Sequence, residues 1–364
     1  MDEIVFYFVA FISACVVSLL LIPGILALAH RKGWYDKIDD RKIHVTETPR
    51  LGGVGMFASF FVIGVIAMFV ANSVDTLQDN PLTVGSLIGL AAGVILIHVV
   101  GLIDDFTSIR ALIKLVGQIL AATIAAVGGL TIHRLGLPGV PGGIELGIIA
   151  YPVTVIWIIA LSNAVNLVDG IDGYAGGIAA NAALIYGVVA LMTGNQTQAV
   201  LSFILLGSIL GFLAFNFPPA RIFMGDSGSL FLGFVLAVLP LIPGSDGIRT
   251  MPFIVPISLL LIPILDTLYA IIRRYREGRP FYSPDREHLH HKLLDLGLAP
   301  RTILAIVYSY CFIMGLSALL ISSFRSPWAI VAQLSVWIVA TIVFFIPAWL
   351  FKRRATNRTE AETT

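Results

Sequence analysis

The sequence is constrained above all by its repeated apolar runs, each long enough to cross a lipid bilayer as a helix. A crossing helix needs roughly 20 mostly apolar residues. Eleven such runs occur, at 4–29, 51–71, 82–100, 111–129, 147–165, 175–193, 199–217, 228–243, 251–272, 302–322 and 327–350. Only 12% of the residues are charged, about half the share found in soluble domains. The sequence therefore predicts an all-α polytopic membrane protein with about eleven transmembrane helices: one membrane domain over residues 1–350 and a disordered tail over 351–364.

The distribution of Lys and Arg predicts how these helices are oriented. Cytoplasmic loops of membrane proteins carry an excess of both residues. With the N-terminus placed outside, 20 of the 23 Lys and Arg residues fall on the cytoplasmic side, and only Arg134, Arg249 and Arg325 fall on the other. We therefore expect an external N-terminus and a cytoplasmic C-terminus. Cys15 and Cys311 lie inside apolar runs, which argues against a disulfide framework or a thiolate metal site.

Four short polar segments fall on the predicted cytoplasmic side, at 101–105, 163–173, 223–229 and 285–291. The orientation was inferred from Lys and Arg alone, so the agreement of these segments is independent of it. The first three of these segments bring five carboxylates to one membrane face: Asp104, Asp105, Asp169, Asp172 and Asp226. Such a concentration of acids at one face predicts a functional site there.

Several of these residues also have a purely structural interpretation. Asp104 and Asp105 could end a helix at the headgroup layer, although adjacent carboxylates repel each other and favour a bound cation. Asp226 could be the N-cap of the apolar run that follows it. His98, which lies within a predicted span, is expected to be a hydrogen-bonded core residue. Asp266 precedes two arginines by about two helical turns, so a long-reach ion pair with them is open.

A polar stripe in the third segment favours function. Asn163, Asn166 and Asp169 follow one another at intervals of three, so consecutive members are neighbours on one helix face. The glycines at 170 and 173 allow the backbone to approach a ligand closely. We interpret this stripe as part of a binding site.

The histidines of the fourth segment and the cations around them complete the predicted site. His288, His290 and His291 fall within four residues, and imidazole would suit zinc. The abundance of carboxylate and amide oxygen on the same face instead favours a hard cation, Mg²⁺, with Mn²⁺ as a substitute. The cations of loop 273–301, with Lys42 and Lys114 on the same face, are then candidate phosphate receptors. Arg273, Arg274 and Arg276 taken alone are better explained as anchors on the positive, cytoplasmic side.

A carboxylate-bound cation, a ring of basic groups and a membrane interface together indicate phosphoryl chemistry on a lipid. Two other classes stay open at this point. A transporter would bind its ion at intramembrane carboxylates near the bilayer midplane, whereas the acids here gather at one face. A metal-dependent lipid phosphatase would use the same residues with water as the nucleophile.

The motifs resemble one known family, and they do so over most of the chain. The matching segments are Asp-Asp-Arg-Lys-Ile-His with Pro-Arg-Leu-Gly-Gly (39–53), Gly-Leu-Ile-Asp-Asp (101–105) with Lys114 and Gln118, Asn-Ala-Val-Asn-Leu-Val-Asp-Gly-Ile-Asp-Gly (163–173), Phe-Met-Gly-Asp-Ser-Gly-Ser (223–229) and Asp-Arg-Glu-His-Leu-His-His-Lys-Leu-Leu (285–294). In them the chain resembles the polyprenyl-phosphate N-acetylhexosamine-1-phosphate transferases. Its His-Leu-His-His form is similar to that of the branch that transfers GlcNAc-1-phosphate.

The resemblance implies an activity, its partners and a place in the cell (inner) membrane, with the active site on the cytoplasmic face. The expected reaction transfers GlcNAc-1-phosphate from UDP-GlcNAc to undecaprenyl phosphate and releases UMP, with Mg²⁺ required, as the first step of a lipid-linked cell-envelope glycan. Another UDP-N-acetylhexosamine, or transfer of phospho-MurNAc-pentapeptide, remains an alternative with the same chemistry. The expected partners are therefore the sugar nucleotide, the polyprenyl phosphate and the bilayer, with no nucleic acid; a homodimer is left open.

The resemblance also implies roles for individual residues. We expect Asp104 and Asp105 to be catalytic or to orient the lipid phosphate. Asp169 is also expected to be catalytic and, with Asp172, to line the nucleotide-sugar site, while Asp226 with Asn166 is expected to bind the metal. The expected substrate-binding residues are Lys42, Lys114, Asn163, Asp172, Arg286, His288, His290 and His291.

Overall fold

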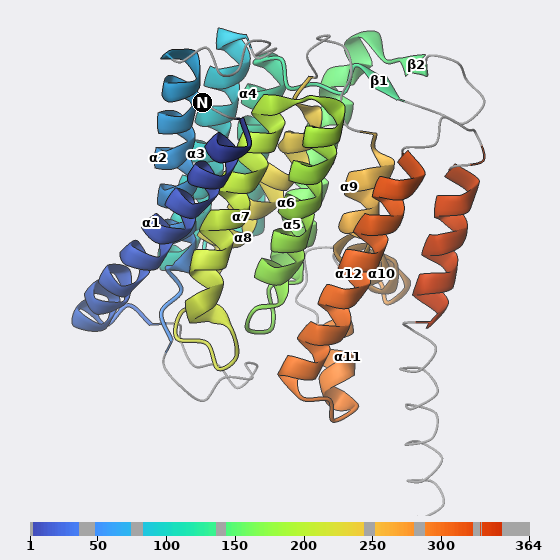
Figure 1. Ribbon diagram of the computed structural model, residues 1–364. Coiled ribbons are helices and arrows are strands. Elements are labelled where there is room, and N and C mark those ends of the chain that lie inside the picture. Colours follow the sequence, from blue (N-terminus) through green and yellow to red (C-terminus); the bar gives the residue numbers. More distant parts are fainter. Residues whose placement is uncertain are drawn as a thin grey trace, which may run out of the picture.

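The computed structural model describes residues 3–35, 48–73, 83–135, 143–243, 252–279, 288–322, 328 and 330–343. This part of the chain is nearly all helical (Figure 1). The helices are α1 (Glu3–Lys32), α2 (Gly52–Ser73), α3 (Val84–Thr107), α4 (Ala111–Val127), α5 (Ala150–Leu167), α6 (Tyr174–Thr193), α7 (Gln196–Asn216), α8 (Gly225–Val238), α9 (Ile254–Leu259), α10 (Leu261–Arg276), α11 (Leu289–Asp295), α12 (Pro300–Ser322) and a last helix over Ile330–Val343. Strands β1 (Arg134–Leu135) and β2 (Ile144–Glu145) pair antiparallel at one end of the bundle.

The helices confirm a polytopic membrane protein. Within the described ranges, seven helices are long and apolar enough to cross a membrane, and three further apolar helices are shorter. These helices establish that the protein crosses the membrane several times, but they do not establish how many times. The eleven spans and the N-out orientation therefore stay predictions. The predicted tail and the candidate residues Lys42 and Arg286 lie outside the described residues.

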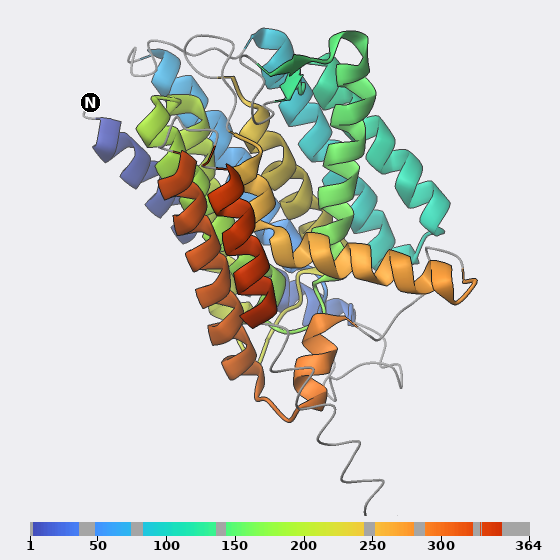
Figure 2. The ribbon, with the colours of Figure 1, turned by 90° about the vertical axis from the view of Figure 1, so that its right-hand side faces the viewer.

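The single span predicted over 251–272 is wrong. The chain there forms two helices, α9 and α10, which meet at Leu260. Pro263 explains the break, because a proline has no N–H to donate and its ring clashes with the carbonyl four residues earlier. Figure 2 shows α10 lying across the other helices instead of along them. Hydropathy shows one continuous apolar run here and gives no sign of the change in direction between α9 and α10.

The outward side of α10 is apolar. Leu268, Ile271, Ile272 and Tyr275 are all exposed, and their spacing puts them on one helix face. Three arginines follow in the last turn of the same helix. A helix with one apolar face and a basic end is typical of a segment that lies in the membrane interface.

The core of the bundle is α8, which is buried on all sides from Ser227 to Val238. Its first turn is held close to its neighbours by glycines. A Cβ on Gly53 would lie 2.2 Å from the Gly228 nitrogen, and one on Gly101 would lie 2.5 Å from the Asp226 carbonyl oxygen. Small residues of this kind let helices in membranes approach backbone to backbone. The start of α8, which carries Asp226, is therefore fixed against α2 and α3.

Candidate active site

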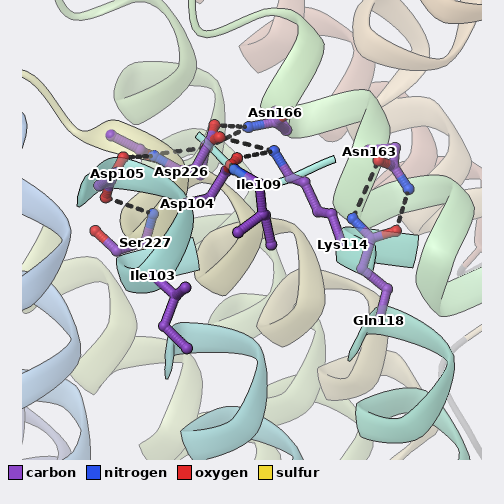
Figure 3. A network of polar contacts seen from close by, with 12 residues as sticks. Ile103, Asp104, Asp105, Ile109, Lys114, Gln118, Asn163, Asn166, Asp226 and Ser227 are labelled. Atoms are coloured by element: carbon purple, nitrogen blue, oxygen red, sulfur yellow. Dashed lines mark hydrogen bonds and ion pairs between the residues drawn. The ribbon is translucent and has the colours of Figure 1, made fainter. Parts of the chain in front are cut away.

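Four helix ends meet in a polar cluster at one end of the bundle, built on Lys114 of α4 (Figure 3). The Lys114 Nζ donates to Asp104 Oδ2 at 2.9 Å and to Asp226 Oδ2 at 2.7 Å. Asn166, at the end of α5, donates from its amide nitrogen to Asp226 Oδ1 at 2.6 Å and to Ser229 Oγ at 2.8 Å. The cluster thus joins residues from α3, α4, α5 and α8. Asp104, Asn166 and Asp226 come from three of the polar segments that the sequence analysis identifies.

Asp104 reaches Lys114 because of the tight turn between α3 and α4. The helix ends at Ser108, which has a left-handed φ of 50° and donates its N–H to the Asp104 carbonyl oxygen. The Asp104 Oδ1 then accepts from the Ile109 N–H at 2.8 Å. One carboxylate oxygen therefore holds the turn, and the other faces the ammonium group of α4.

Asp105 points to a different partner and caps α8. Its Oδ1 accepts from the Asp226 N–H at 2.7 Å and its Oδ2 accepts from the Ser227 N–H at 3.0 Å. The first N–H groups of a helix have no partner within the helix, and they attract negative charge. Gly225 makes room, since a Cβ there would lie 2.6 Å from Asp105 Oδ2. The geometry gives Asp105 a structural role; its predicted catalytic role stays a prediction.

Asp226 does not act as the N-cap of α8, which was its alternative structural role. Its side chain accepts from Lys114 and Asn166, while the amides of the first turn of α8 are taken by Asp105. The carboxylate of Asp226 is therefore directed into the shared cluster instead of along its own helix.

Asn163 lies one turn deeper in α5 and is engaged by protein partners. It exchanges hydrogen bonds with Gln118, at 2.9 Å and 3.1 Å, and it also donates to the Ile159 carbonyl oxygen at 2.8 Å. This reciprocal amide pair ties α5 to α4. The predicted substrate-binding role of Asn163 is not tested by these contacts, which show an amide already satisfied within the bundle.

The loop between α5 and α6 adds two further acids. Asp172 Oδ2 accepts from the Ala220 N–H at 2.9 Å. Loss of hydration raises the pKa of the partly accessible Asp169 to about 7; Arg50 opposes the rise, and the negative charges of Asp226, Asp105 and Asp172 add to it. Asp169 thus lies within the electrostatic reach of the central cluster.

The histidines lie on α11 beside that loop. His290 is 1% exposed, and neither ring nitrogen has a hydrogen-bond partner among the described residues. A Cβ on Gly170 would lie 2.2 Å from His290 Nε2, so this glycine lets the ring approach the loop. Burial, with the neighbouring His291, lowers the pKa of His290 to about 3, so the imidazole is neutral. The His291 ring lies tilted beside it, at 42° and 4.3 Å between ring centroids.

Two other polar residues within the bundle have clear partners. His98 Nδ1 lies 3.1 Å from the Ser227 carbonyl oxygen, and its ring stacks on Phe57 at 4.0 Å, which confirms the expected core histidine. Asp266 accepts from the His288 ring and from the Leu289 N–H at the start of α11. Sequence spacing carried no signal for this contact, since the partners lie 22 residues apart.

The donor set at the cluster fits a cation that arrives with a phosphate substrate. Within the described ranges, no three His, Cys, Asp or Glu side chains form a ready cation cage. Mg²⁺ is commonly held by one or two carboxylates, with substrate phosphates and water completing its shell. Asp104 and Asp226 supply two carboxylates facing one point, now taken by the Lys114 ammonium. The predicted ligand Asn166 turns its amide nitrogen toward Asp226 and would need to present its oxygen.

Comparison with known proteins places the chain beside membrane sugar-phosphate transferases. The sequence model of glycosyl transferase family 4 matches residues 87–244. A probable undecaprenyl-phosphate N-acetylglucosaminyl 1-phosphate transferase of Bacillus subtilis is 35% identical over 339 residues, covering 93% of this chain and 89% of the relative. A decaprenyl-phosphate N-acetylglucosaminephosphotransferase of Mycobacterium tuberculosis (strain H37Rv) is 33% identical, covering 92% and 87%. An undecaprenyl-phosphate alpha-N-acetylglucosaminyl 1-phosphate transferase of Yersinia pestis is 29% identical, covering 77% and 74%.

Proposed function

The chain belongs to the polyprenyl-phosphate GlcNAc-1-phosphate transferases of glycosyl transferase family 4, and we propose that its activity is carried by the cluster around Lys114. The reaction of this group is transfer of GlcNAc-1-phosphate to a polyprenyl phosphate in cell-envelope glycan synthesis. For this chain we propose UDP-GlcNAc as the donor, undecaprenyl phosphate as the acceptor and UMP as the leaving product.

The proposed chemistry makes one bond and breaks one. An oxygen of the lipid phosphate attacks the phosphorus that bears the sugar, and the bond from this phosphorus to the bridging oxygen of the diphosphate breaks, so UMP leaves with that oxygen. The second pKa of a phosphate monoester is near 6, so the attacking group is already ionised near neutral pH. Bringing two anions together against their repulsion is therefore the main task of the site.

The Lys114 ammonium group carries the proposal. It is the cation that the fold holds between two carboxylates, and an ammonium group so placed can donate to a diphosphate and offset the charge that builds on the leaving oxygen. Asp104 and Asp226 would hold Mg²⁺, which when bound would supply positive charge to offset the negative charge of the phosphates. Neutral His290 is available as a hydrogen-bond partner because its ring nitrogens have none among the described residues.

The position of the cluster favours this reaction over ion transport. Its acids lie where helices end or begin: Asp104 in the last turn of α3 and Asp226 in the first turn of α8. A transporter site would be expected near the bilayer midplane. We propose that this end of the bundle is the cytoplasmic face of the inner membrane, because the Lys and Arg bias of the sequence puts these helix ends there.

An assay on the purified protein tests the proposal. UMP release is followed after mixing the protein with UDP-GlcNAc, undecaprenyl phosphate and Mg²⁺. We expect release only when the lipid is present and a diphospholipid product in equal amount. Nucleotide release without the lipid would indicate a hydrolase, and no release with any UDP-N-acetylhexosamine would refute the function. UMP release with UDP-GalNAc or UDP-MurNAc-pentapeptide in place of UDP-GlcNAc shows which sugar the enzyme accepts. UMP release after chelation of the metal shows whether Mg²⁺ is required.

A further inference from the structure

Asp266 is a buried acid of α10 that the proposed chemistry does not use, and its partners lie at the start of α11. We propose that Asp266 is a positioning residue: it fixes His288 and the start of α11, and so presents His290 to the loop between α5 and α6. This inference rests on the transferase function proposed above and assigns a residue to it.

Both oxygens of the Asp266 carboxylate are engaged by α11. Oδ2 lies 3.0 Å from His288 Nδ1, and Oδ1 accepts from the Leu289 N–H at 3.0 Å. The side chains of Asp266 and His288 are each 7% exposed. A carboxylate so buried is costly unless donors satisfy it, and these two contacts supply donors. The single side chain thus ties the interface helix α10 to the histidine segment.

The backbone contact matters because α11 is short and is not capped by its own sequence. The helix has seven residues, and the preceding His288 forms no side-chain capping bond. Four N–H groups at a helix start lack partners within the helix, and Asp266 takes the first of them. It therefore supplies from α10 the cap that a local Ser, Thr or Asp would normally provide.

The side-chain contact fixes the ring of His288. A carboxylate that accepts from Nδ1 keeps the proton on that nitrogen and sets the ring orientation. The His288 ring is nearly parallel to that of His290, with an interplanar angle of 7° and centroids 5.8 Å apart. A fixed His288 therefore limits how the His290 ring can turn.

The contact between Asp266 and His288 holds the His290 ring against the loop between α5 and α6. This ring fits against Gly170 without room for a methyl group, and it lies 5.7 Å from the ring of Tyr174, between centroids. A shift of α11 would move His290 away from this loop, which also carries Asp169. We thus divide the motif into a structural His288 and a ligand-facing His290, with Asp266 acting through the former.

Three single variants and one double variant test the proposal by their kinetics. Asp266→Asn keeps the size of the side chain but loses one acceptor, and His288→Gln breaks the same contact from the other side. We expect each to lower kcat/KM by about 10- to 100-fold, the usual effect of losing a supporting hydrogen bond behind a functional group. The double variant should be no worse than the poorer single variant, because both changes remove one interaction. Asp266→Glu, which keeps the charge, should recover part of the activity.

Glu277→Gln is the matched control. It makes the same carboxylate-to-amide change just past the end of the same helix, where Glu277 pairs only at the surface with Arg279, and we expect wild-type kinetics. ¹⁵N spectra of labelled histidine supply a second readout: the His288 Nδ1–H signal of the wild type should be lost in Asp266→Asn. A melting temperature for every variant separates misfolding from mispositioning.

Each result bears on the proposal. Wild-type kcat/KM in folded Asp266→Asn, multiplicative losses in the double variant, or a His288 that carries no proton on Nδ1 would overturn the positioning role while the transferase function stands. A wild-type protein without transfer activity would overturn the function, and the positioning role with it. If Asp266→Asn does not fold, the same kinetic comparison is decided by His288→Gln and Asp266→Glu.

Discussion

Lys114 of α4 and Asp226 of α8 lie 112 residues apart in the chain and form an ion pair of 2.7 Å at the end of the bundle. The same ammonium group also binds Asp104. Their side chains are largely buried, so the pair is less screened by solvent than a surface pair. The arrangement explains how two acids can lie close together, because the ammonium group between them offsets their repulsion.

Replacing Lys114 should therefore expose a repulsion between the two acids. We expect Lys114→Gln to lower kcat by at least about 100-fold, the scale of losing one donor aimed at developing charge, and to lower the melting temperature. Adding Asp104→Asn should restore the melting temperature without restoring activity. Calorimetry and UMP release measure the two effects, and an equal recovery of both would contradict this assignment.

Asp226→Asn should nearly abolish turnover. The substitution removes one of the two carboxylates proposed to hold Mg²⁺ and also weakens the hold on Lys114. Turnover measured across a Mg²⁺ titration checks this: the residual activity should need more Mg²⁺ than the wild type needs. Near-normal rates at limiting Mg²⁺ would refute the ligand role.

Asp105→Ala should act first on stability. It leaves the N–H groups of Asp226 and Ser227 without the acceptor that caps α8, and loss of a cap costs about 0.5–2 kcal/mol. We expect a lower melting temperature, with activity lost in proportion as the first turn of α8 loosens. Asp105→Asn, which keeps one acceptor, should lie between Ala and the wild type. Full stability of the Ala variant together with lost activity would instead support the predicted catalytic role.

Gly170→Ala should separate the histidine from the loop. A Cβ at this position would lie 2.2 Å from His290 Nε2, so the ring must move. We expect kcat/KM to fall by about 10-fold or more, as when a functional group is misplaced by about 1 Å. Gly24→Ala is the control, since a Cβ there meets nothing within 4 Å; it should keep wild-type activity. Equal kinetics in the two variants would remove His290 from the site.

Acid should destabilise the protein through His290. Burial lowers the pKa of this imidazole in the folded protein to about 3, below the value of about 6.5 in an unfolded chain. The unfolded state therefore binds a proton that the folded state excludes, and this cost appears as the pH falls below about 6.5. Between pH 7 and pH 5, the melting temperature of His290→Gln should fall by less than that of the wild type. Parallel losses would show that His290 is protonated in the folded state.

Much of the site could be predicted from the sequence because its residues are unusual where they stand. Asp104, Asn166 and Asp226 are polar residues at the ends of apolar runs, and the structure brings all three around Lys114. Asp105 and Asn163 looked equally unusual, yet one caps a helix and the other pairs with Gln118. A sequence shows that a buried polar group needs a partner, but not which partner it finds.

The class of the protein was determined by the sequence alone, because apolar runs of bilayer length leave a chain few alternatives to helices across a membrane. The tertiary structure alone decided the turn at Pro263 that sends α10 across the bundle, and the contact from Asp266 to His288 that follows from it. Periodicity relates residues only within one helix, over three or four positions. Contacts between helices depend instead on which ends the packed bundle brings together, and no local pattern records that choice.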